Sequence, residues 1–331
     1  MAEFKNIAVI GGGSWATAIV KMLSESQTKV GWWMRNEETI AHIKRYGNNP
    51  NYISAAELFP EKLNLDSDIN AVVDAADCIV LAVPSAFLSS TLEPLEVSLK
   101  NKFVVSAIKG IVPEKNTIIG DYLHDNYQIL YKNIGVITGP CHAEEVALER
   151  LSYLTVACED VEKAQWFAEQ IGCRYIKTNV SEDIYGTEIA AVLKNVIAIA
   201  SGVCHSLGYG DNFQAVLASN AIREIKRFVD TVHPIKRDIK ESAYLGDLLV
   251  TVYSQFSRNR TFGNMVGKGY SVKSAQLEMN MVAEGYYAVK CIKEINEQYN
   301  IDMPITNAVY HILYEKISPV IEMRLLSDNL N

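Results

Sequence analysis

The stretch IAVIGGGSWATAIV (Ile7–Val20) decides the fold of this chain. An apolar run typical of a strand leads into three glycines, and a helical pattern begins directly after them. Gly11, Gly13 and Ala16 form the pattern G-x-G-x-x-G/A, in which the first glycine permits a tight turn. Gly13 lets a pyrophosphate approach backbone N–H groups at the helix N-terminus, and Ala16 lets the helix pack on the sheet. An ordinary strand-to-helix turn is the alternative, but the position after the first strand favours dinucleotide binding.

Strand-like and helical segments alternate over the first half of the chain. The helical pattern of DVEKAQWFAEQI, which begins at Asp160, is one example. The strand-like runs are almost continuously apolar, as parallel strands covered on both faces are. This alternation predicts an α/β fold with a doubly wound sheet and right-handed crossovers. The runs begin at Asn6, Thr28, Asp77, Phe103, Ile134, Tyr153 and Arg174.

From about Glu182 the strand signals stop and only helical patterns follow. A chain of 331 residues is longer than a single core usually serves, so two domains are expected. We predict a Rossmann-like dinucleotide-binding domain over residues 1–183 and an all-helical substrate-binding domain over 184–331, joined by a helix. The expected helices cover residues 182–206, 212–230, 243–254, 284–299 and 303–315.

The composition restricts the class of partner. A formal net charge of −8 argues against nucleic acid and against an anionic membrane surface. Six scattered cysteines without a CxxC pair favour a reduced compartment, and we expect a cytoplasmic protein. The N-terminus does not have the pattern of a signal peptide, and the apolar stretches fall short of a bilayer span, so we expect no stable membrane insertion. No metal is expected either.

The second predicted strand ends in WWMRN, without the acidic residue that usually binds a ribose 2′-hydroxyl. Arg35 stands at this place, 22 positions after Gly13. Because an arginine can bind a 2′-phosphate, we expect NADPH to be tolerated. A solvated surface arginine is the alternative, and the choice between NADH and NADPH stays open.

Other strand ends lie at the sheet edge where open parallel sheets bind ligands. FVVSAIKGI places Lys109 just after a strand, where it points either into the binding crevice or into solvent. TGPCHAEEVA carries Gly139 and Cys141 and predicts a helix that starts by Ala143. In LAVPS, Pro84 shapes a turn near the expected nicotinamide ribose.

The segment IAAVLKNVIAIASGV (Ile189–Val203) is apolar on all sides apart from Lys194 and Asn195. Such a helix is a buried helix, and lysine is almost never buried without a partner. Lys194 therefore either extends its ammonium group to a surface or projects into a polar cavity where its pKa shifts. A helix at a domain junction favours the cavity, and Asn195 adds two donors and an acceptor.

The segment LGDLLVTVYSQFSRNRTFG adds further polar groups. Asp247 and Thr251 are four residues apart and share one face of a helix. In an acidic protein, a nearby cluster of guanidinium, hydroxyl and amide donors predicts a local site for a phosphate dianion. An exposed basic loop is the alternative. The cluster is expected in one short loop: Ser257, Arg258, Asn259 and Arg260.

In this order the motifs resemble those of the NAD(P)-dependent glycerol-3-phosphate dehydrogenases of the bacterial type. SAIKGI, GPCHAEEVA, AAVLKNVIAIASG, LGDLLVTVYSQFSRNRTFG and VAEG accompany the glycine turn, and the resemblance extends from Ile7 to about Pro304. It implies interconversion of dihydroxyacetone phosphate and sn-glycerol 3-phosphate with NAD(P)H, for glycerophospholipid synthesis.

The resemblance also implies roles for single residues. Lys194 resembles the proton-transferring lysine, Lys109 the lysine that reaches substrate and cofactor, and Asp247 completes the catalytic set. The implied substrate-binding positions are Lys109, Gly139, Cys141, Lys194, Asn195, Asp247, Thr251, Ser257, Arg258 and Asn259. The implied cofactor-binding positions are Gly11, Gly13, Ser14, Trp15, Arg35, Lys109, Ala143, Arg258, Val282 and Glu284.

Three points stay open at this stage. Cys141 replaces the usual Ser or Thr of the family, and a thiol is a weaker donor, so its contact with substrate is open. Glu284 could equally be a helix cap. Two lysines that share a desolvated site should lower the pKa of at least one of them, while Asp247 would oppose that shift.

Two other functions remain as alternatives. One is a related dehydrogenase that acts on a different hydroxy acid. The other is a non-catalytic NAD(P)-sensing scaffold, although a sensor needs neither Lys109 nor Lys194. A second copy of the chain, in a homodimer, is the macromolecular partner that we consider.

Overall fold

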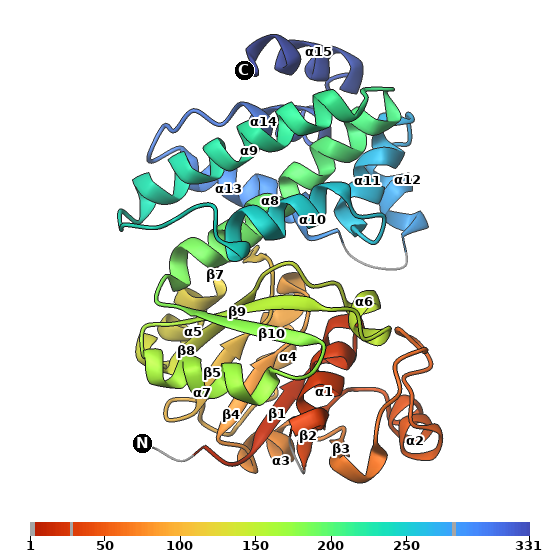
Figure 1. Cartoon of the computed structure of the whole chain (residues 1–331), viewed down its shortest axis with the longest axis vertical. Coiled ribbons are helices and arrows are strands. Elements are labelled where there is room, and N and C mark those ends of the chain that lie inside the picture. The colour runs from red at the N-terminus through yellow and green to blue at the C-terminus, as the bar shows by residue number, and fades with distance from the viewer. Residues whose placement is uncertain (1–3, 27–28, 280–282) are drawn as a thin grey trace. The chain divides into compact units, whose positions relative to one another are not determined.

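The computed structural model describes residues 4–26, 29–279 and 283–331. The chain divides into two compact units (Figure 1). Unit 1 comprises Met1–Ile108 and Ile119–Ile184, and unit 2 comprises Lys109–Ile118 and Tyr185–Asn331. The sequence predicted one boundary between residues 183 and 184. The second unit does begin close to this boundary, at Tyr185, but it also includes the earlier segment Lys109–Ile118.

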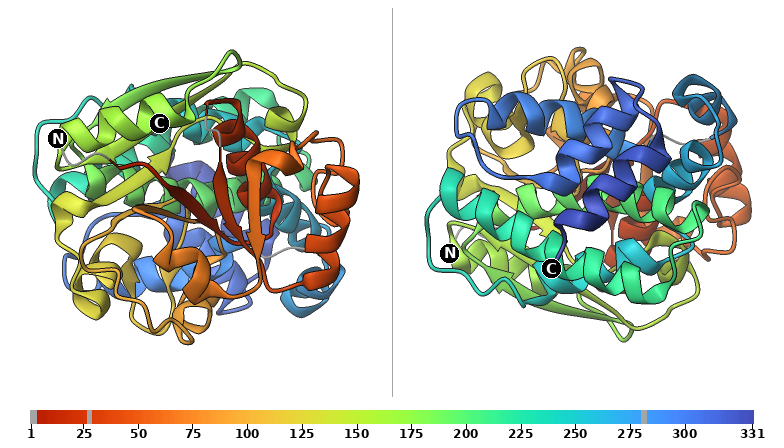
Figure 2. Two further views of the ribbon diagram at one scale, coloured as in Figure 1. Left: turned by 90° about the horizontal axis from the view of Figure 1, so that it is seen from below. Right: turned by 90° about the horizontal axis from the view of Figure 1, so that it is seen from above.

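The described part of unit 1 forms an eight-stranded sheet in the order β10-β9-β8-β5-β4-β1-β2-β3 (Figure 1). Every residue of β1 is buried, and β1 pairs in parallel with β2 on one side and β4 on the other. The prediction of a doubly wound α/β domain is confirmed, and the left view of Figure 2 shows the strands fanning out with the sheet's twist. The strands are β1 (Ile7–Ile10), β2 (Val30–Trp33), β3 (Leu63–Asp66), β4 (Cys78–Leu81), β5 (Phe103–Ser106), β8 (Ile134–Thr138), β9 (Ser152–Cys158) and β10 (Ile176–Ser181).

Two features of the sheet differ from the prediction. β9 runs antiparallel to β8, although parallel strands were expected, because an apolar run carries no information about strand direction. β3 was not expected at all. It is an edge strand whose burial alternates, with Leu63 and Leu65 buried and Asn64 and Asp66 exposed, so LNLD has no continuous apolar run.

Helices cover the sheet of unit 1. α1 follows the glycine turn and packs against α6 and α7. α2 begins at an N-cap, Asn36, whose side chain accepts a hydrogen bond from Thr39 N, and it ends at Gly47 in the left-handed conformation. The helices are α1 (Ser14–Ser26), α2 (Glu37–Tyr46), α3 (Ile69–Asp74), α4 (Leu88–Leu92), α5 (Ile119–Tyr127), α6 (Ala143–Ala147) and α7 (Val161–Ile171).

Unit 2 is helical, as predicted, apart from a small hairpin, β6 (Ile111–Val112) and β7 (Thr117–Ile118). Ile111 and Ile118 are buried in the core of this unit, which explains why the hairpin belongs to it. The right view of Figure 2 shows α13, α14 and α15 in blue. The helices are α8 (Ile184–Ser206), α9 (Asp211–Val232), α10 (Asp247–Tyr253), α11 (Arg258–Gly267), α12 (Val272–Glu278), α13 (Glu284–Asn296), α14 (Pro304–Leu313) and α15 (Pro319–Asn329).

The sequence missed α11, α12 and α15. The polar group at 257–260 was expected in a loop, and this was wrong: Ser257 is the N-cap of α11, and the next residues form its first turn. A π-helical turn, Ser242–Gly246, leads into α10. The polar first turn of α11 has no apolar periodicity of its own, which is why its helical character did not register.

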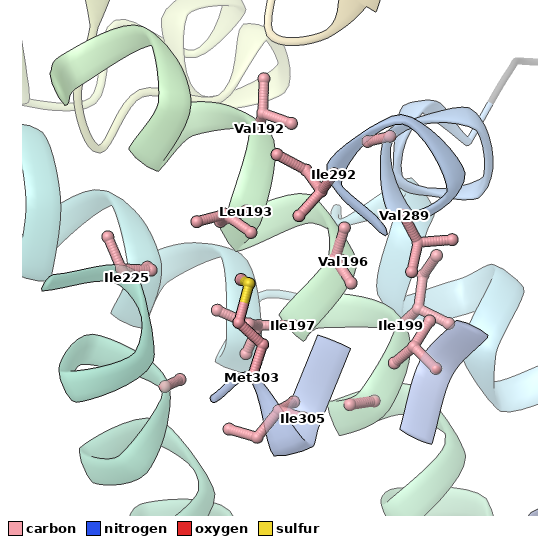
Figure 3. Packing of buried hydrophobic residues seen from close by; sticks show 14 of the residues in the cluster. Val192, Leu193, Val196, Ile197, Ile199, Ile225, Val289, Ile292, Met303 and Ile305 are labelled. Atoms are coloured by element: carbon pink, nitrogen blue, oxygen red, sulfur yellow. The ribbon is translucent and has the colours of Figure 1, made fainter. Parts of the chain in front are cut away.

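α8 is a core helix of unit 2 (Figure 3). Its 23 residues are long and apolar enough to span a membrane, contrary to the expectation that every apolar stretch falls short. Most of the helix is buried inside the protein, however, which is typical of a core helix. The labelled side chains around it come from α8, α9, α13 and α14 and the residue before α14: Val192, Leu193, Val196, Ile197, Ile199, Ile225, Val289, Ile292, Met303 and Ile305.

Candidate active site

The turn after β1 has the backbone geometry that a pyrophosphate requires. Gly11 has φ 130°, and a Cβ at this position would lie 2.4 Å from the carbonyl oxygen of Ala82, so only glycine fits. A Cβ on Gly13, by contrast, would meet nothing within 4 Å. The space beside Gly13 is therefore open at the N-terminus of α1, where backbone N–H groups and the helix dipole favour an anion.

The other expected cofactor positions of unit 1 border this turn or its neighbouring strand. Ser14 and Trp15 begin α1, with Ser14 buried and Trp15 partly buried. Arg35 is exposed just beyond β2, which pairs with β1 in parallel, so it lies at the carboxyl edge of the sheet. A dinucleotide that starts at the glycine turn would extend its ribose toward this edge. The residues present fit a nicotinamide dinucleotide.

A second turn lies at the same sheet edge, after β8. Gly139 has φ 116°, and a Cβ there would lie 2.8 Å from the carbonyl oxygen of Tyr153, so glycine is again required. Cys141 is buried and forms no disulfide, and Ala143 begins α6. These three positions belong to unit 1, whereas the expected catalytic residues belong to unit 2.

In unit 2, one carboxylate bridges two lysines. Asp247 Oδ1 lies 2.5 Å from Lys194 Nζ, and Asp247 Oδ2 lies 3.7 Å from Lys109 Nζ. The side chains of Asp247 and Lys194 are 2% and 6% exposed, whereas that of Lys109 keeps 19% of its surface. Lys194 therefore does not extend to the surface. Lys109, Lys194 and Asp247 thus form one charged cluster, although Lys194 and Asp247 are 53 positions apart in the chain and Lys109 is farther still from both.

Burial lowers the pKa of Lys194 from its ordinary value to about 7. Loss of hydration is the main cause, because it disfavours the charged ammonium form. The negative charge of Asp247 opposes the shift, and the positive charge of Lys109 adds to it. An amine with a pKa close to neutrality can both donate and accept a proton at cellular pH.

Two neighbours hold the cluster in place. Asn195 Nδ2 donates to the backbone oxygen of Lys109 at 2.9 Å, which ties α8 to the segment that carries Lys109. Thr251 lies on the same helix face as Asp247, as predicted, and its hydroxyl donates to Asp247 O at 2.6 Å. Because that proton is used within α10, Thr251 offers a ligand only the lone pairs of its oxygen.

The start of α11 presents the expected anion-binding groups. The Ser257 hydroxyl accepts a hydrogen bond from Arg260 N at 3.3 Å and so caps the helix. Arg258 is exposed at the first helical position. Asn259 is buried, and its Oδ1 accepts a hydrogen bond from Gly285 N at 2.9 Å. That bond joins α11 to the first turn of α13, where Glu284 lies.

Comparison with known proteins connects these features. Residues 6–164 match the family described as the N-terminus of NAD-dependent glycerol-3-phosphate dehydrogenase, and residues 183–323 match its C-terminus. The chain belongs to the NAD-dependent glycerol-3-phosphate dehydrogenase family. A glycerol-3-phosphate dehydrogenase [NAD(P)+] of Staphylococcus carnosus is 30% identical over 322 residues, with 97% of each chain covered. One from Salinibacter ruber is 34% identical and covers 95% of this chain and 92% of its own.

Solved structures agree. Glycerol-3-phosphate dehydrogenase from Coxiella burnetii superposes with a TM-score of 0.89 at 26% identity and covers 97% of this chain and 98% of its own. D-mandelate dehydrogenase, at 16% identity and a TM-score of 0.61, shares the fold alone. The family consists of NAD(P)-dependent oxidoreductases that act on a CH–OH group, so the predicted enzyme class and cofactor are confirmed.

The sequence analysis did not identify two glycines that let helices of unit 2 pack closely against α8. A Cβ on Gly263 of α11 would lie 2.1 Å from Ile199 O of α8, and one on Gly285 of α13 would lie 2.6 Å from Asn195 O. Both glycines thus allow helix backbones to approach α8 closely. Glycines inside helical patterns were the available signal. Val282, an expected cofactor contact, lies outside the described residues.

Proposed function

We propose that this chain reduces dihydroxyacetone phosphate to sn-glycerol 3-phosphate with NAD(P)H, and that Lys194 transfers the proton. The observation that carries the proposal is that Lys109 and Lys194 share the carboxylate of Asp247, and that Lys194 is buried with a pKa of about 7. The membership of the family supports the same activity. A scaffold that only senses the nucleotide would not need to desolvate a lysine in this way.

The glycine turn would hold the cofactor's pyrophosphate, and Arg35 would lie toward its adenosine ribose. When bound, the cofactor supplies the hydride. Its remaining proposed contacts are Ser14, Trp15, Lys109, Ala143, Arg258, Val282 and Glu284. In this proposal residues 1–183 bind the dinucleotide and residues 184–331 bind the substrate.

The proton step is assigned to Lys194. When C2 of the ketone gains a hydride, its oxygen acquires negative charge. Lys194 gives the proton of its ammonium group to this oxygen and is left as a neutral amine. Asp247 orients the ammonium group before transfer, and the positive charge of Lys109 stabilises the developing alkoxide. In the reverse direction the neutral amine of Lys194 accepts the hydroxyl proton of glycerol 3-phosphate.

The phosphate is assigned to the start of α11. Arg258 supplies a guanidinium group, and the N-terminus of this ten-residue helix adds backbone N–H groups and a favourable dipole. Binding the phosphate there fixes the reacting carbon and so lowers the entropic barrier to reaction. The other proposed substrate contacts are Gly139, Cys141, Asn195, Thr251, Ser257 and Asn259.

The proposal is tested by initial rates with dihydroxyacetone phosphate and with 2-keto acids, each with NADH and with NADPH. We expect turnover with dihydroxyacetone phosphate and far less with the 2-keto acids. The opposite order would support a hydroxy-acid dehydrogenase. Tight binding of NADH without turnover of any substrate would support the sensing scaffold.

The cellular setting is part of the same proposal. None of the six cysteines, all of which are among the described residues, forms a disulfide, which supports a reducing compartment such as the cytoplasm. There the product would serve glycerophospholipid synthesis. We include a homodimer in the proposal, and sedimentation of the purified chain would test it.

A further inference from the structure

Side chains hold the backbone carbonyl groups of all three glycines in the turn of unit 1. Trp32 Nε1 donates to Gly11 O at 2.7 Å. Asn49 Nδ2 donates to Gly12 O at 3.1 Å. The hydroxyl of Thr17 donates to Gly13 O at 2.9 Å. We call Trp32, Asn49 and Thr17 the carbonyl clamp.

The carbonyl clamp is buried and internally connected. Its three side chains belong to residues with no exposed surface. Asn49 Nδ2 also donates to Thr17 Oγ1 at 2.9 Å, and Asn49 Oδ1 accepts from Asn51 N at 3.0 Å. Three of the four hydrogen-bonding positions of the Asn49 amide are therefore used. Asn49 comes from the segment after α2, so a distant part of the chain reaches the turn.

Holding a carbonyl group also fixes the direction of an N–H group. In a trans peptide the C=O of one residue and the N–H of the next point in opposite directions. The bond to Gly11 O thus orients the N–H of Gly12, the bond to Gly12 O that of Gly13, and the bond to Gly13 O that of Ser14. The N–H groups of Gly13 and Ser14 lie at the N-terminus of α1, beside the open space next to Gly13.

Three glycines in a row make such control necessary. Glycine has no Cβ and reaches many backbone conformations, so an unrestrained turn would lose entropy when a ligand orders it. At the first two glycines a substitution that would limit this freedom is hindered, because a Cβ on Gly12 would lie 3.1 Å from Met34 Cβ and one on Gly11 would lie 2.4 Å from Ala82 O. At Gly13 a Cβ would instead occupy the open space beside the turn. Hydrogen bonds to the carbonyl groups restrict the turn without adding a side chain to it.

We propose that Asn49 is a positioning residue for the cofactor: with Trp32 and Thr17 it sets the glycine turn in its pyrophosphate-binding shape before the dinucleotide arrives. Preorganisation of this kind raises affinity because less freedom is lost on binding. The inference rests on the proposed function only in requiring that the chain binds a nicotinamide dinucleotide.

The test is the affinity of the purified full chain for NADH and for ADP-ribose, measured by calorimetry. ADP-ribose keeps the pyrophosphate and lacks the nicotinamide. Asn49→Ala should weaken both ligands by a similar factor, about tenfold, as expected for the loss of buried hydrogen bonds. KM for NADH should rise in parallel, while kcat at saturating NADH and KM for dihydroxyacetone phosphate stay close to those of the parent. Amide hydrogen exchange at residues 12–14 should become faster.

Thr17→Val is the second variant, because valine has nearly the shape of threonine and is expected to fold even if Asn49→Ala does not. It should weaken both ligands, and its effect should not add fully to that of Asn49→Ala, because the two side chains are bonded to each other. Unchanged affinity for both ligands in Thr17→Val would overturn the proposal, as would a loss of kcat with unchanged affinity.

Asn70→Ala is the matched control. The side chain of Asn70 also forms hydrogen bonds with loop backbone in unit 1. It donates to Pro94 O at 3.0 Å and accepts from Glu96 N at 2.7 Å, but it takes no part in the glycine turn. This variant should bind NADH as the parent does. Equal weakening in Asn70→Ala would mean general destabilisation and would overturn the proposal. If the parent binds NADH but turns over no dihydroxyacetone phosphate, the proposed function fails while the binding test still decides the role of Asn49.

Discussion

Among the described residues, two lysines are buried on helices, one in each unit. Lys21 of α1 is 2% exposed and donates to Glu149 Oε1 at 3.0 Å and to Glu57 O at 3.4 Å. Lys194 of α8 is 5% exposed and is held by Asp247. The sequence drew attention to the second lysine because its helix is apolar on all sides, but the burial of the two is nearly the same.

The partners distinguish them. Glu149 is about one-third exposed, and it also pairs with Arg174 at the surface. Hydrogen bonding to Lys21 is the main cause that lowers the pKa of Glu149. Asp247 is buried and shared with a second lysine, and the pKa of Lys194 is lowered. A buried lysine alone therefore indicates little about function. A buried, shared counter-ion and an amine near neutrality support the proton transfer that we propose for Lys194.

The largest expected effect is the loss of turnover when the ammonium group of Lys194 is removed, and Lys21 provides the comparison. Lys194→Ala should lower kcat by roughly 10²–10⁴ and leave the Kd for NADH almost unchanged, because only the proton transfer is lost. Lys21→Met keeps the aliphatic stem and removes only the charge, and its kcat should equal that of the parent. Steady-state rates and NADH titration measure both. Near-normal turnover in Lys194→Ala would refute the assignment.

The comparison extends to an exposed cation, Arg258. Arg258→Ala should reduce the preference for dihydroxyacetone phosphate over dihydroxyacetone by about 10- to 100-fold, the range expected when charged hydrogen bonds to a phosphate are lost. The ratio of kcat/KM for the two substrates gives this quantity. An unaltered ratio would place the phosphate elsewhere.

The pH dependence should report the shifted amine. In the proposed mechanism reduction requires protonated Lys194, so kcat/KM for dihydroxyacetone phosphate should be constant below pH 7 and fall about tenfold per unit well above it. Oxidation of glycerol 3-phosphate requires the neutral amine and should rise through the same range. Because Asp247 raises this pKa, Asp247→Asn should move the midpoint to lower pH. A midpoint that moves upward would contradict this account.

The smallest effect is expected at Lys21, on stability. The pair with Glu149 should contribute about 1 kcal/mol or less, since the carboxylate is partly solvated. The lowered pKa of Glu149 means that this contribution is present above pH 4.5 and is lost as the pH falls through the folded-state value. Urea unfolding of the parent and of Lys21→Met should therefore differ at pH 7 and converge in acid. A difference that persists in acid would assign the effect to packing.

Local patterns predicted much of this protein, and their failures have physical reasons. Six of the seven strand-like runs cover all or nearly all of their observed strands, whereas RYIK covers only the first two residues of β10. The direction of β9, the edge strand β3 and helix α11 could not be read, because pairing direction, half-buried edges and polar first turns leave no apolar period. The clamp residue Asn49 lies in a segment without any motif.

The sequence alone determined the α/β-then-helical order and the glycine turn, because these depend on local spacing and on residue type. The resemblance to the family supplied the residues of the charged cluster, for which local spacing left a solvent-exposed position open. Only the tertiary structure decided that Lys109 belongs with the helical unit and that one carboxylate holds both lysines. It also decided that Lys194 is desolvated enough for its pKa to fall to about 7. Hydration and distance between charges depend on which distant segments come together, and no local pattern encodes them.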